Sequence, residues 1–265
     1  MEGPATAGLL MQFIPCHPLD MASGGRTAVI IGASSGIGEA LARELHQTGW
    51  CLGLFARRTD KLETLAEELG AGVSVGYIDV SKSDCTGSLQ ALMDDLDDVD
   101  LIIISTGCGF LNPMHDDGPD LETVSVNVLG FMALAQAAFR YFKKRGHGHL
   151  AVITSVAALR GNGEATVYAA SKAFQSIFLD GLRESAKQLK LPITVTELQP
   201  SFVDTAMMKA KTPLPPLVRR LLVCDASTVA RQMIRAISRK RKHAYITKRY
   251  AVIAFLLKLL PRPGR

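Results

Sequence analysis

The chain has 265 residues, of which 48% are hydrophobic, 21% charged and 6% aromatic. This composition is that of a folded globular protein and excludes an intrinsically disordered one. The five cysteines are widely spaced and include no CxxC pair, which excludes a disulfide scaffold and a thiolate zinc site and favours a reducing compartment. We therefore expect a cytoplasmic protein with no metal site.

The net charge of +5 is distributed unevenly along the chain. Residues 205–265 contain fifteen basic residues and one acidic residue, whereas residues 1–204 contain fifteen basic and twenty-four acidic residues. A nucleic-acid-binding protein would more usually spread its basic groups over its recognition surface, and the chain has no zinc-finger, RNP or helix-turn-helix motif. We therefore expect no nucleic-acid partner.

Short apolar runs alternate with amphipathic segments of helix length from residue 27 onward. The runs that predict strands are Thr27–Ile31, Cys51–Phe55, Val73–Ile78, Asp100–Ser105, His149–Thr154, Ile193–Leu198 and, more weakly, Ala244–Thr247. Apolar strands that alternate with helices predict a parallel sheet with helices on both faces, joined by right-handed crossovers. No internal repeat or linker divides this pattern, so we expect one doubly wound α/β domain over residues 23–248.

Three segments depart from the alternation. Residues 1–22 predict a flexible extension, because they have no basic region and no apolar run long enough for a signal peptide. Residues 201–225 combine three closely spaced prolines with methionines and leucines, which predicts an apolar lid within the domain. Residues 249–265 predict a basic amphipathic helix that packs on the domain, forms a subunit contact or lies on an anionic membrane surface.

A glycine-rich turn follows the first predicted strand and opens the first predicted helix. Glycine permits the tight turn, lets backbone N–H groups approach a pyrophosphate and allows the helix to pack closely. The N-terminus of the helix adds partial positive charge beside the phosphate. The candidate dinucleotide-binding residues of this turn are Gly32, Ser34, Ser35, Gly36, Ile37 and Gly38. The alternative is a glycine-rich turn that binds no ligand.

The end of the second predicted strand indicates which dinucleotide binds. An acidic residue about twenty positions after the glycine turn would bind the ribose 2′-hydroxyl of NAD, whereas an arginine accommodates the 2′-phosphate of NADP. Here that position is Ala56, followed by Arg57 and Arg58. Guanidinium groups hold phosphate through charge-assisted hydrogen bonds, so the sequence favours NADP(H). The alternative is a solvated helix start capped by Thr59 or Asp60.

Tyr168 and Lys172 form the candidate catalytic pair. Residues four apart lie on one face of a helix, and a nearby ammonium group favours the phenolate. We therefore expect Lys172 to lower the pKa of Tyr168 from about 10 toward the working range of an acid–base catalyst. Ser155, at the end of the fifth predicted strand, could hydrogen-bond a carbonyl oxygen or merely cap a loop. Asn127, within an apolar helix segment, predicts a buried polar network or a purely structural role.

This set of motifs resembles the short-chain dehydrogenase/reductase family from about Arg26 to Thr247. The resemblance implies a Rossmann-type sheet of about seven strands in the order 3-2-1-4-5-6-7, and a homo-oligomer, either dimer or tetramer. It further implies that tyrosine is the general acid/base and that lysine binds the nicotinamide ribose and lowers the tyrosine pKa. Serine would orient the substrate, and asparagine would support a water relay to lysine. The four matching positions are Asn127, Ser155, Tyr168 and Lys172.

Further cofactor-binding positions follow from the same resemblance. They are Asp79, Val80, Gly107, Tyr168, Lys172, Pro200, Val203 and Thr205. Three positions depart from the family pattern: Ile31 replaces a threonine, Ile104-Ser105-Thr106-Gly107 replaces Asn-Asn-Ala-Gly, and Ser201 replaces the glycine after Pro200. The first two bear on stability and cofactor affinity, and Ser201 bears on how the lid closes.

Together the motifs predict an NADP(H)-dependent enzyme that interconverts a carbonyl compound and a secondary alcohol, acting on the CH–OH group of donors. We expect it to work as a reductase, and the apolar character of residues 201–225 favours an apolar or acyl-type ketone. One alternative is a dinucleotide-binding regulatory protein without turnover. Another is a lipid carbonyl reductase attached to a membrane surface through its C-terminal helix.

Overall fold

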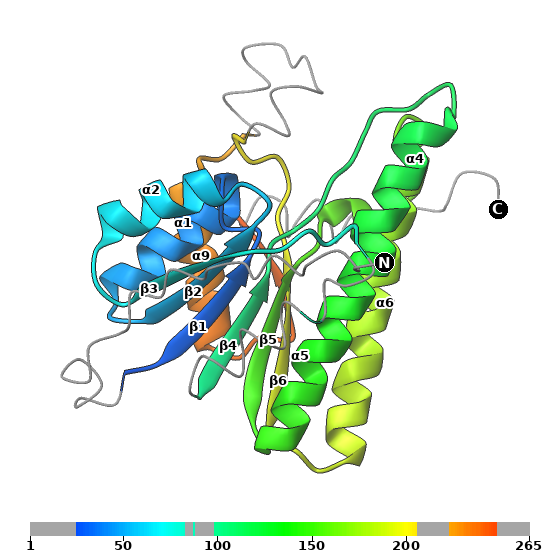
Figure 1. Ribbon diagram of the computed structural model, residues 1–265. Coiled ribbons are helices and arrows are strands. Elements are labelled where there is room, and N and C mark those ends of the chain that lie inside the picture. Colours follow the sequence, from blue (N-terminus) through cyan, green and yellow to red (C-terminus); the bar gives the residue numbers. More distant parts are fainter. Residues whose placement is uncertain (1–24, 83–86, 88–97, 206–222, 248–265) are drawn as a thin grey trace, which may run out of the picture.

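The computed structural model describes residues 25–82, 87, 98–205 and 223–247. Seven parallel strands form one sheet in the order β3-β2-β1-β4-β5-β6-β7 (Figure 1). The strands are β1 (Thr27–Ile31), β2 (Cys51–Ala56), β3 (Val73–Tyr77), β4 (Val99–Ile104), β5 (Gly148–Ile153), β6 (Ile193–Gln199) and β7 (His243–Tyr245). Each predicted strand overlaps an observed one, and the predicted strand order is confirmed.

Helices cover both faces of the sheet, as expected (Figure 1). They are α1 (Gly36–Gln47), α2 (Thr59–Leu69), α4 (Asp117–Val124), the π-helical turn η2 (Ser125–Gly130), α5 (Phe131–Arg145), the 3₁₀ turn η3 (Val156–Leu159), α6 (Thr166–Gln188) and α9 (Ala226–Ser238). Helices α1, α2 and α9 pack on one face, and α5 and α6 pack on the other. The run Asp117–Arg145 is long and apolar enough to cross a membrane, but half of its apolar window is buried inside the protein.

The two apolar cores meet at the central strand β1, whose five residues are all buried. Ala28 and Ile30 point toward the core under α1 and α9, whereas Val29 and Ile31 point toward the core under α5 and α6. Successive side chains of a strand face opposite sides of the sheet, so a strand buried on both sides must be apolar throughout. This burial explains why the strands appear in the sequence as continuous apolar runs.

The strand order reverses between β1 and β4. Strand β1 pairs with β2 on one side and with β4 on the other. In open parallel sheets, ligands bind in the crevice at the carboxyl ends of the strands at such a switch point. The two ends of the predicted lid also meet here, because Val203 forms a parallel bridge with Cys224. Residues 1–22, the middle of the lid and the C-terminal helix predicted over 249–265 lie outside the described residues.

Candidate active site

A cleft of about 1010 Å³ opens at the carboxyl ends of the central strands. Its walls include every predicted site residue except Gly38 and Asn127. Gly38 packs beneath the glycine turn, and Asn127 lies fully buried. Its lining also includes the apolar residues Phe110, Leu111, Val156, Ala157 and Phe202. Across the described part of the chain, no cluster of three or more His, Cys, Asp or Glu could hold a metal ion.

The glycine turn between β1 and α1 forms part of the wall of the cleft. Gly36, the first residue of α1, has φ of +62°, a left-handed conformation that glycine adopts at little cost. A Cβ atom on Gly38 would lie 2.1 Å from the carbonyl oxygen of Gly32, so only glycine lets the helix pack on the turn. The first N–H groups of α1 have no partners within the helix, which makes this end suitable for an anion.

Arg58 lies over the glycine turn. Its Nη2 atom donates hydrogen bonds to the hydroxyl oxygens of Ser34 at 3.0 Å and Ser35 at 2.8 Å. Helix α2 begins at Thr59 with Arg58 at its N-cap, and the Arg58 side chain does not cap the first N–H groups of the helix. The alternative prediction of a cap by Thr59 or Asp60 is therefore wrong: Arg58 holds the cap position and directs its guanidinium toward the cleft.

Arg57 lines the same wall of the cleft and acts on Asp79. Burial raises the pKa of Asp79, but hydrogen bonds from Ser81 and the positive charge of Arg57 outweigh it and hold the pKa below its usual value of 3.8. The carboxylate accepts bonds from the backbone N–H and the hydroxyl of Ser81 at 3.0 and 2.7 Å. The ends of β2 and β3 therefore bring an ionised carboxylate, that of Asp79, within electrostatic reach of the Arg57 guanidinium.

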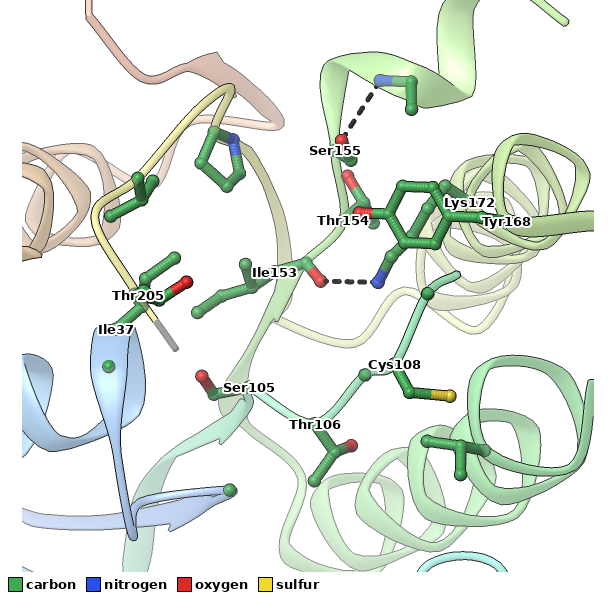
Figure 2. Close-up of a pocket in the computed structure, with 18 of the residues that line it drawn as sticks. Ile37, Ser105, Thr106, Cys108, Ile153, Thr154, Ser155, Tyr168, Lys172 and Thr205 are labelled. Atoms are coloured by element: carbon green, nitrogen blue, oxygen red, sulfur yellow. Dashed lines mark hydrogen bonds between the residues drawn. The ribbon is translucent and has the colours of Figure 1, made fainter. Parts of the chain in front are cut away.

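Tyr168 and Lys172 project from α6 into the cleft, opposite Ser155 at the end of β5 (Figure 2). The ammonium nitrogen of Lys172 lies 5.9 Å from the centre of the Tyr168 ring. Ser155 also caps η3, because its hydroxyl accepts a 3.1 Å hydrogen bond from the N–H of Ala157. The predicted spacing thus brings the phenol, the ammonium and a hydroxyl to one part of the cleft.

The predicted direction of the Tyr168 pKa is wrong. Burial raises the pKa of the phenol above 10, and a hydrogen bond with Ser155 offsets only part of that rise. Burial also lowers the pKa of Lys172 from 10.5 to about 8, against the opposing influence of Cys108 and Glu197. Loss of hydration disfavours the charged form of each group, so burial keeps the phenol protonated and makes the ammonium easier to deprotonate.

Asn127 lies in the π-helical turn η2 and is fully buried. Its side-chain oxygen accepts from the N–H of Cys108 at 3.0 Å, and its nitrogen donates to the carbonyl of Cys108 at 2.6 Å and the hydroxyl of Ser171 at 3.1 Å. The predicted polar network is confirmed. It ties the loop after β4 to the helix that carries Tyr168, and π-helical turns often mark such functional sites.

Gln175 and Gly109 are among the site residues that the sequence prediction did not name. Gln175, 1% exposed, accepts a hydrogen bond from the Lys172 ammonium at 3.0 Å. Its spacing of three residues from Lys172 on a helix was a usable signal. Gly109 lies so close to Tyr168 that a Cβ atom would stand 2.4 Å from the ring. No sequence signal marks this contact, because it joins the loop after β4 to a distant helix.

The three positions that depart from the family pattern have different surroundings in the structure. Ile31 is fully buried, and its carbonyl accepts a 2.8 Å hydrogen bond from the N–H of Ser105. The hydroxyl of Thr106 is buried at the cleft and has no hydrogen-bond partner among the described residues. The carbonyl of Pro200, just before Ser201, accepts a bond from the N–H of Val156 at 3.1 Å. An unpaired buried hydroxyl beside a glycine cradle fits a polar ligand in this cleft.

The short chain dehydrogenase family matches residues 26–214. The chain belongs to this family, whose members use nicotinamide cofactors, and is an oxidoreductase. It is 38% identical to nodulation protein G of Rhizobium sp. (strain N33) over 188 residues, covering 69% of this chain and 75% of the relative. It is 31% identical to an uncharacterized oxidoreductase of Mycobacterium tuberculosis over 227 residues, covering 82% and 87%.

Among solved structures, the fold is similar to that of an alcohol dehydrogenase from the archaeon Thermococcus sibiricus, complexed with 5-hydroxy-NADP. The TM-score is 0.73 and the sequence identity 27%, and the match covers 83% of this chain and 95% of the archaeal one.

Proposed function

We propose that this protein is an NADP(H)-dependent reductase that converts an apolar or acyl-type ketone to a secondary alcohol. The observation that carries the proposal is one cleft with Tyr168, Lys172 and Ser155 at its centre and the glycine turn at its end. The apolar residues that line the cleft support an apolar substrate, because such surfaces bind ligands mainly by excluding water.

The glycine turn and two arginines would hold the cofactor. The backbone of Ser35–Ile37 offers N–H groups to a pyrophosphate, and Arg57 and Arg58 offer guanidinium groups to a 2′-phosphate. The hydroxyl of Thr106 adds an unpaired donor at the cleft. The related Thermococcus sibiricus structure, which holds 5-hydroxy-NADP, supports the choice of NADP. When bound, the nicotinamide supplies the hydride for the carbonyl carbon.

The side chains of the cleft position the carbonyl group and supply the proton. Ser155 hydrogen-bonds the carbonyl oxygen and holds it near the Tyr168 hydroxyl. Tyr168 donates its proton to that oxygen as negative charge develops there. Burial keeps the phenol protonated, which suits a proton donor. Lys172, whose pKa is about 8, supplies positive charge behind the phenol and can replace the proton afterwards.

Replacing Tyr168 with phenylalanine tests this function. Removing a general acid costs about 10²–10⁴-fold in rate, so NADPH oxidation across a panel of ketones should fall by that factor. NADPH binding, measured by fluorescence titration, should change little, because the glycine turn and the arginines are intact. Unchanged turnover in Tyr168→Phe would reject the mechanism. A wild-type protein that binds NADPH but reduces no ketone would favour the regulatory alternative.

The remaining partners are also proposals. An exposed apolar face of α6, which includes Phe174, Ile177 and Phe178, supports a homo-oligomer. Light scattering on the full chain measures that state directly, and a monomer would reject it.

Peripheral membrane contact through residues 249–265 and a cytoplasmic location rest on the sequence. Liposome flotation of the full chain against a chain ending at Lys248 tests the contact, and equal flotation would reject it.

A further inference from the structure

The side chain of Gln175 fills the space between Lys172 and the backbone of Asn127. The Lys172 ammonium donates to the amide oxygen of Gln175 at 3.0 Å, and the amide nitrogen donates to the Asn127 carbonyl at 2.8 Å. All three residues are buried, with exposed fractions of 4% or less. The two neighbours fix the orientation of the amide, because a flipped amide would set a donor against the ammonium and an acceptor against the carbonyl.

A side-chain amide binds the ammonium differently from a water molecule. A water molecule can accept a proton on one side and release another on the other side. The Gln175 amide accepts from Lys172 through oxygen and donates from a different atom, its nitrogen, to a carbonyl that has no proton to return. The amide therefore orders the ammonium without passing its proton toward Asn127.

We propose that Gln175 is a positioning residue that fixes the Lys172 ammonium and passes no proton from it toward Asn127. The inference rests on the proposed function, in which Lys172 supports Tyr168. The other recorded hydrogen bond of the ammonium, to the Ile153 carbonyl, is longer at 3.4 Å. Among the described residues, Gln175 is thus the nearest hydrogen-bond acceptor of the ammonium.

Several other groups face the same ammonium and set the background for any change. Tyr168 lies on the same helix, Cys108 on the loop after β4, and Glu197 on β6. Cys108 and Glu197 both raise the pKa of Lys172, whereas burial, the largest influence, lowers it to about 8. None of these groups changes in a Gln175 variant, so the contribution of the amide can be measured separately.

The first test measures the Lys172 pKa in the full chain by NMR, with ¹³Cε-labelled lysine and the signal assigned by its loss in Lys172→Arg. Gln175→Met has similar volume but no acceptor, and we expect a Lys172 pKa lower by about one to two. Gln175→Glu places a carboxylate beside the ammonium and should raise it. Gln188→Met, at the exposed end of the same helix, should leave it unchanged.

A third variant, Gln175→Ala, leaves room for water between Lys172 and Asn127. A water there would restore an acceptor, so the Lys172 pKa should fall less in Gln175→Ala than in Gln175→Met. Activity falls as Lys172 loses its proton. The basic limb of the pH profile of kcat should therefore shift to lower pH less in Gln175→Ala than in Gln175→Met. A Lys172 pKa that stays at the wild-type value in both variants would overturn the positioning role.

A merely structural role gives a different result. Gln175→Met would then lower the melting temperature without moving the Lys172 titration or the basic limb, and this outcome would overturn the positioning role. It would leave the proposed function intact, because the Tyr168→Phe experiment tests that function separately. If Gln175→Met does not fold, Gln175→Glu decides the question: an unchanged Lys172 pKa there would also overturn the proposal.

Discussion

Gly109 determines where the Tyr168 ring can lie. A Cβ atom at this position would stand 2.4 Å from Cδ2 and 2.8 Å from Cε2 of the ring. Gly109→Ala must therefore displace the ring, and misplacing a catalytic group by about 1 Å can cost about 10²-fold in rate. We expect a loss of kcat of that size in NADPH oxidation, with NADPH binding retained.

Gly161→Ala is the matched control for that variant. Gly161 lines the same cleft, but a Cβ atom there would meet no heavy atom within 4 Å. Its kcat should stay near that of the wild type. A Gly109→Ala enzyme as active as the Gly161→Ala enzyme would show that the ring tolerates displacement.

Arg57 and Arg58 should determine the choice between the two nicotinamide dinucleotides. Only NADP carries the 2′-phosphate, so Arg57→Ala and Arg58→Ala should each weaken NADPH binding by about 1–3 kcal/mol and NADH binding much less. Arg43→Ala, which removes a guanidinium paired with Glu39 and Glu68 outside the cleft, is the control. Fluorescence titration with both dinucleotides measures the difference, and equal losses for both would contradict NADP selection.

At the residue scale, the sequence predicts what local spacing decides. Tyr168 and Lys172 share a helix face because they are four residues apart, and Ser155 faces the cleft because it ends a central strand. The direction of the Tyr168 pKa could not be predicted in this way. It depends on burial, which distant segments create, and on how far the Lys172 ammonium lies from the phenol.

At the scale of elements, Asp225 begins α9, the helix that packs against α1. Its carboxylate accepts a 2.8 Å hydrogen bond from the N–H of Thr228 and another from the hydroxyl of Ser227, and these bonds lower its pKa to about 2. Asp225→Ala should reduce the free energy of unfolding by about 1 kcal/mol at pH 7, measured with urea. Asp225→Asn, which keeps an acceptor, should lose less.

The pH dependence of that cap follows from the lowered pKa. The stabilisation by Asp225 is complete above its ordinary pKa of 3.8 and is lost as the pH falls through about 2. The difference between wild type and Asp225→Ala should therefore shrink at strongly acidic pH. A difference that stays constant down to pH 2 would show that the carboxylate charge has no part in the cap.

The strands could be predicted because each buried strand needs apolar residues on both faces, as β1 shows with Val29 and Ile30. The sequence predicted the ends of strands less accurately than their existence. The last strand was expected at Ala244–Thr247, but β7 covers His243–Tyr245. Its first residue is polar because the His243 side chain reaches the buried carboxylate of Glu197 at 2.8 Å. A short edge strand with such a contact carries little apolar signal.

At the scale of the whole molecule, the strand order and the site follow from one topological feature, the reversal between β1 and β4. Right-handed crossovers and short connections leave few arrangements for alternating strands and helices. The glycine turn after β1, the arginines after β2 and Ser155 after β5 then necessarily reach the same edge of the sheet. The amide of Gln175 lies outside this rule, because its place depends on how α6 packs against η2.

Folding as a whole should become less favourable at mildly acidic pH because of His149 on β5. Burial, with a smaller influence of Lys240, lowers its pKa from 6.5 to about 4, and its Nε2 atom lies 2.8 Å from the hydroxyl of Thr196. Between these two pKa values His149 binds more protons in the unfolded chain than in the folded protein, so its contribution to the free energy of unfolding should be constant above pH 6.5 and fall as the pH drops toward 4.

His149→Gln removes the titrating group and should flatten the part of this slope that belongs to His149, measured by urea unfolding between pH 7.5 and about 4.5. Exposed His147, two residues earlier, provides the matched control, because His147→Gln should leave the wild-type slope in place. The slope difference between the two variants isolates the buried imidazole from all carboxylates that titrate in the same range. Identical slopes would mean that His149 is protonated as readily in the folded sheet as in the unfolded chain.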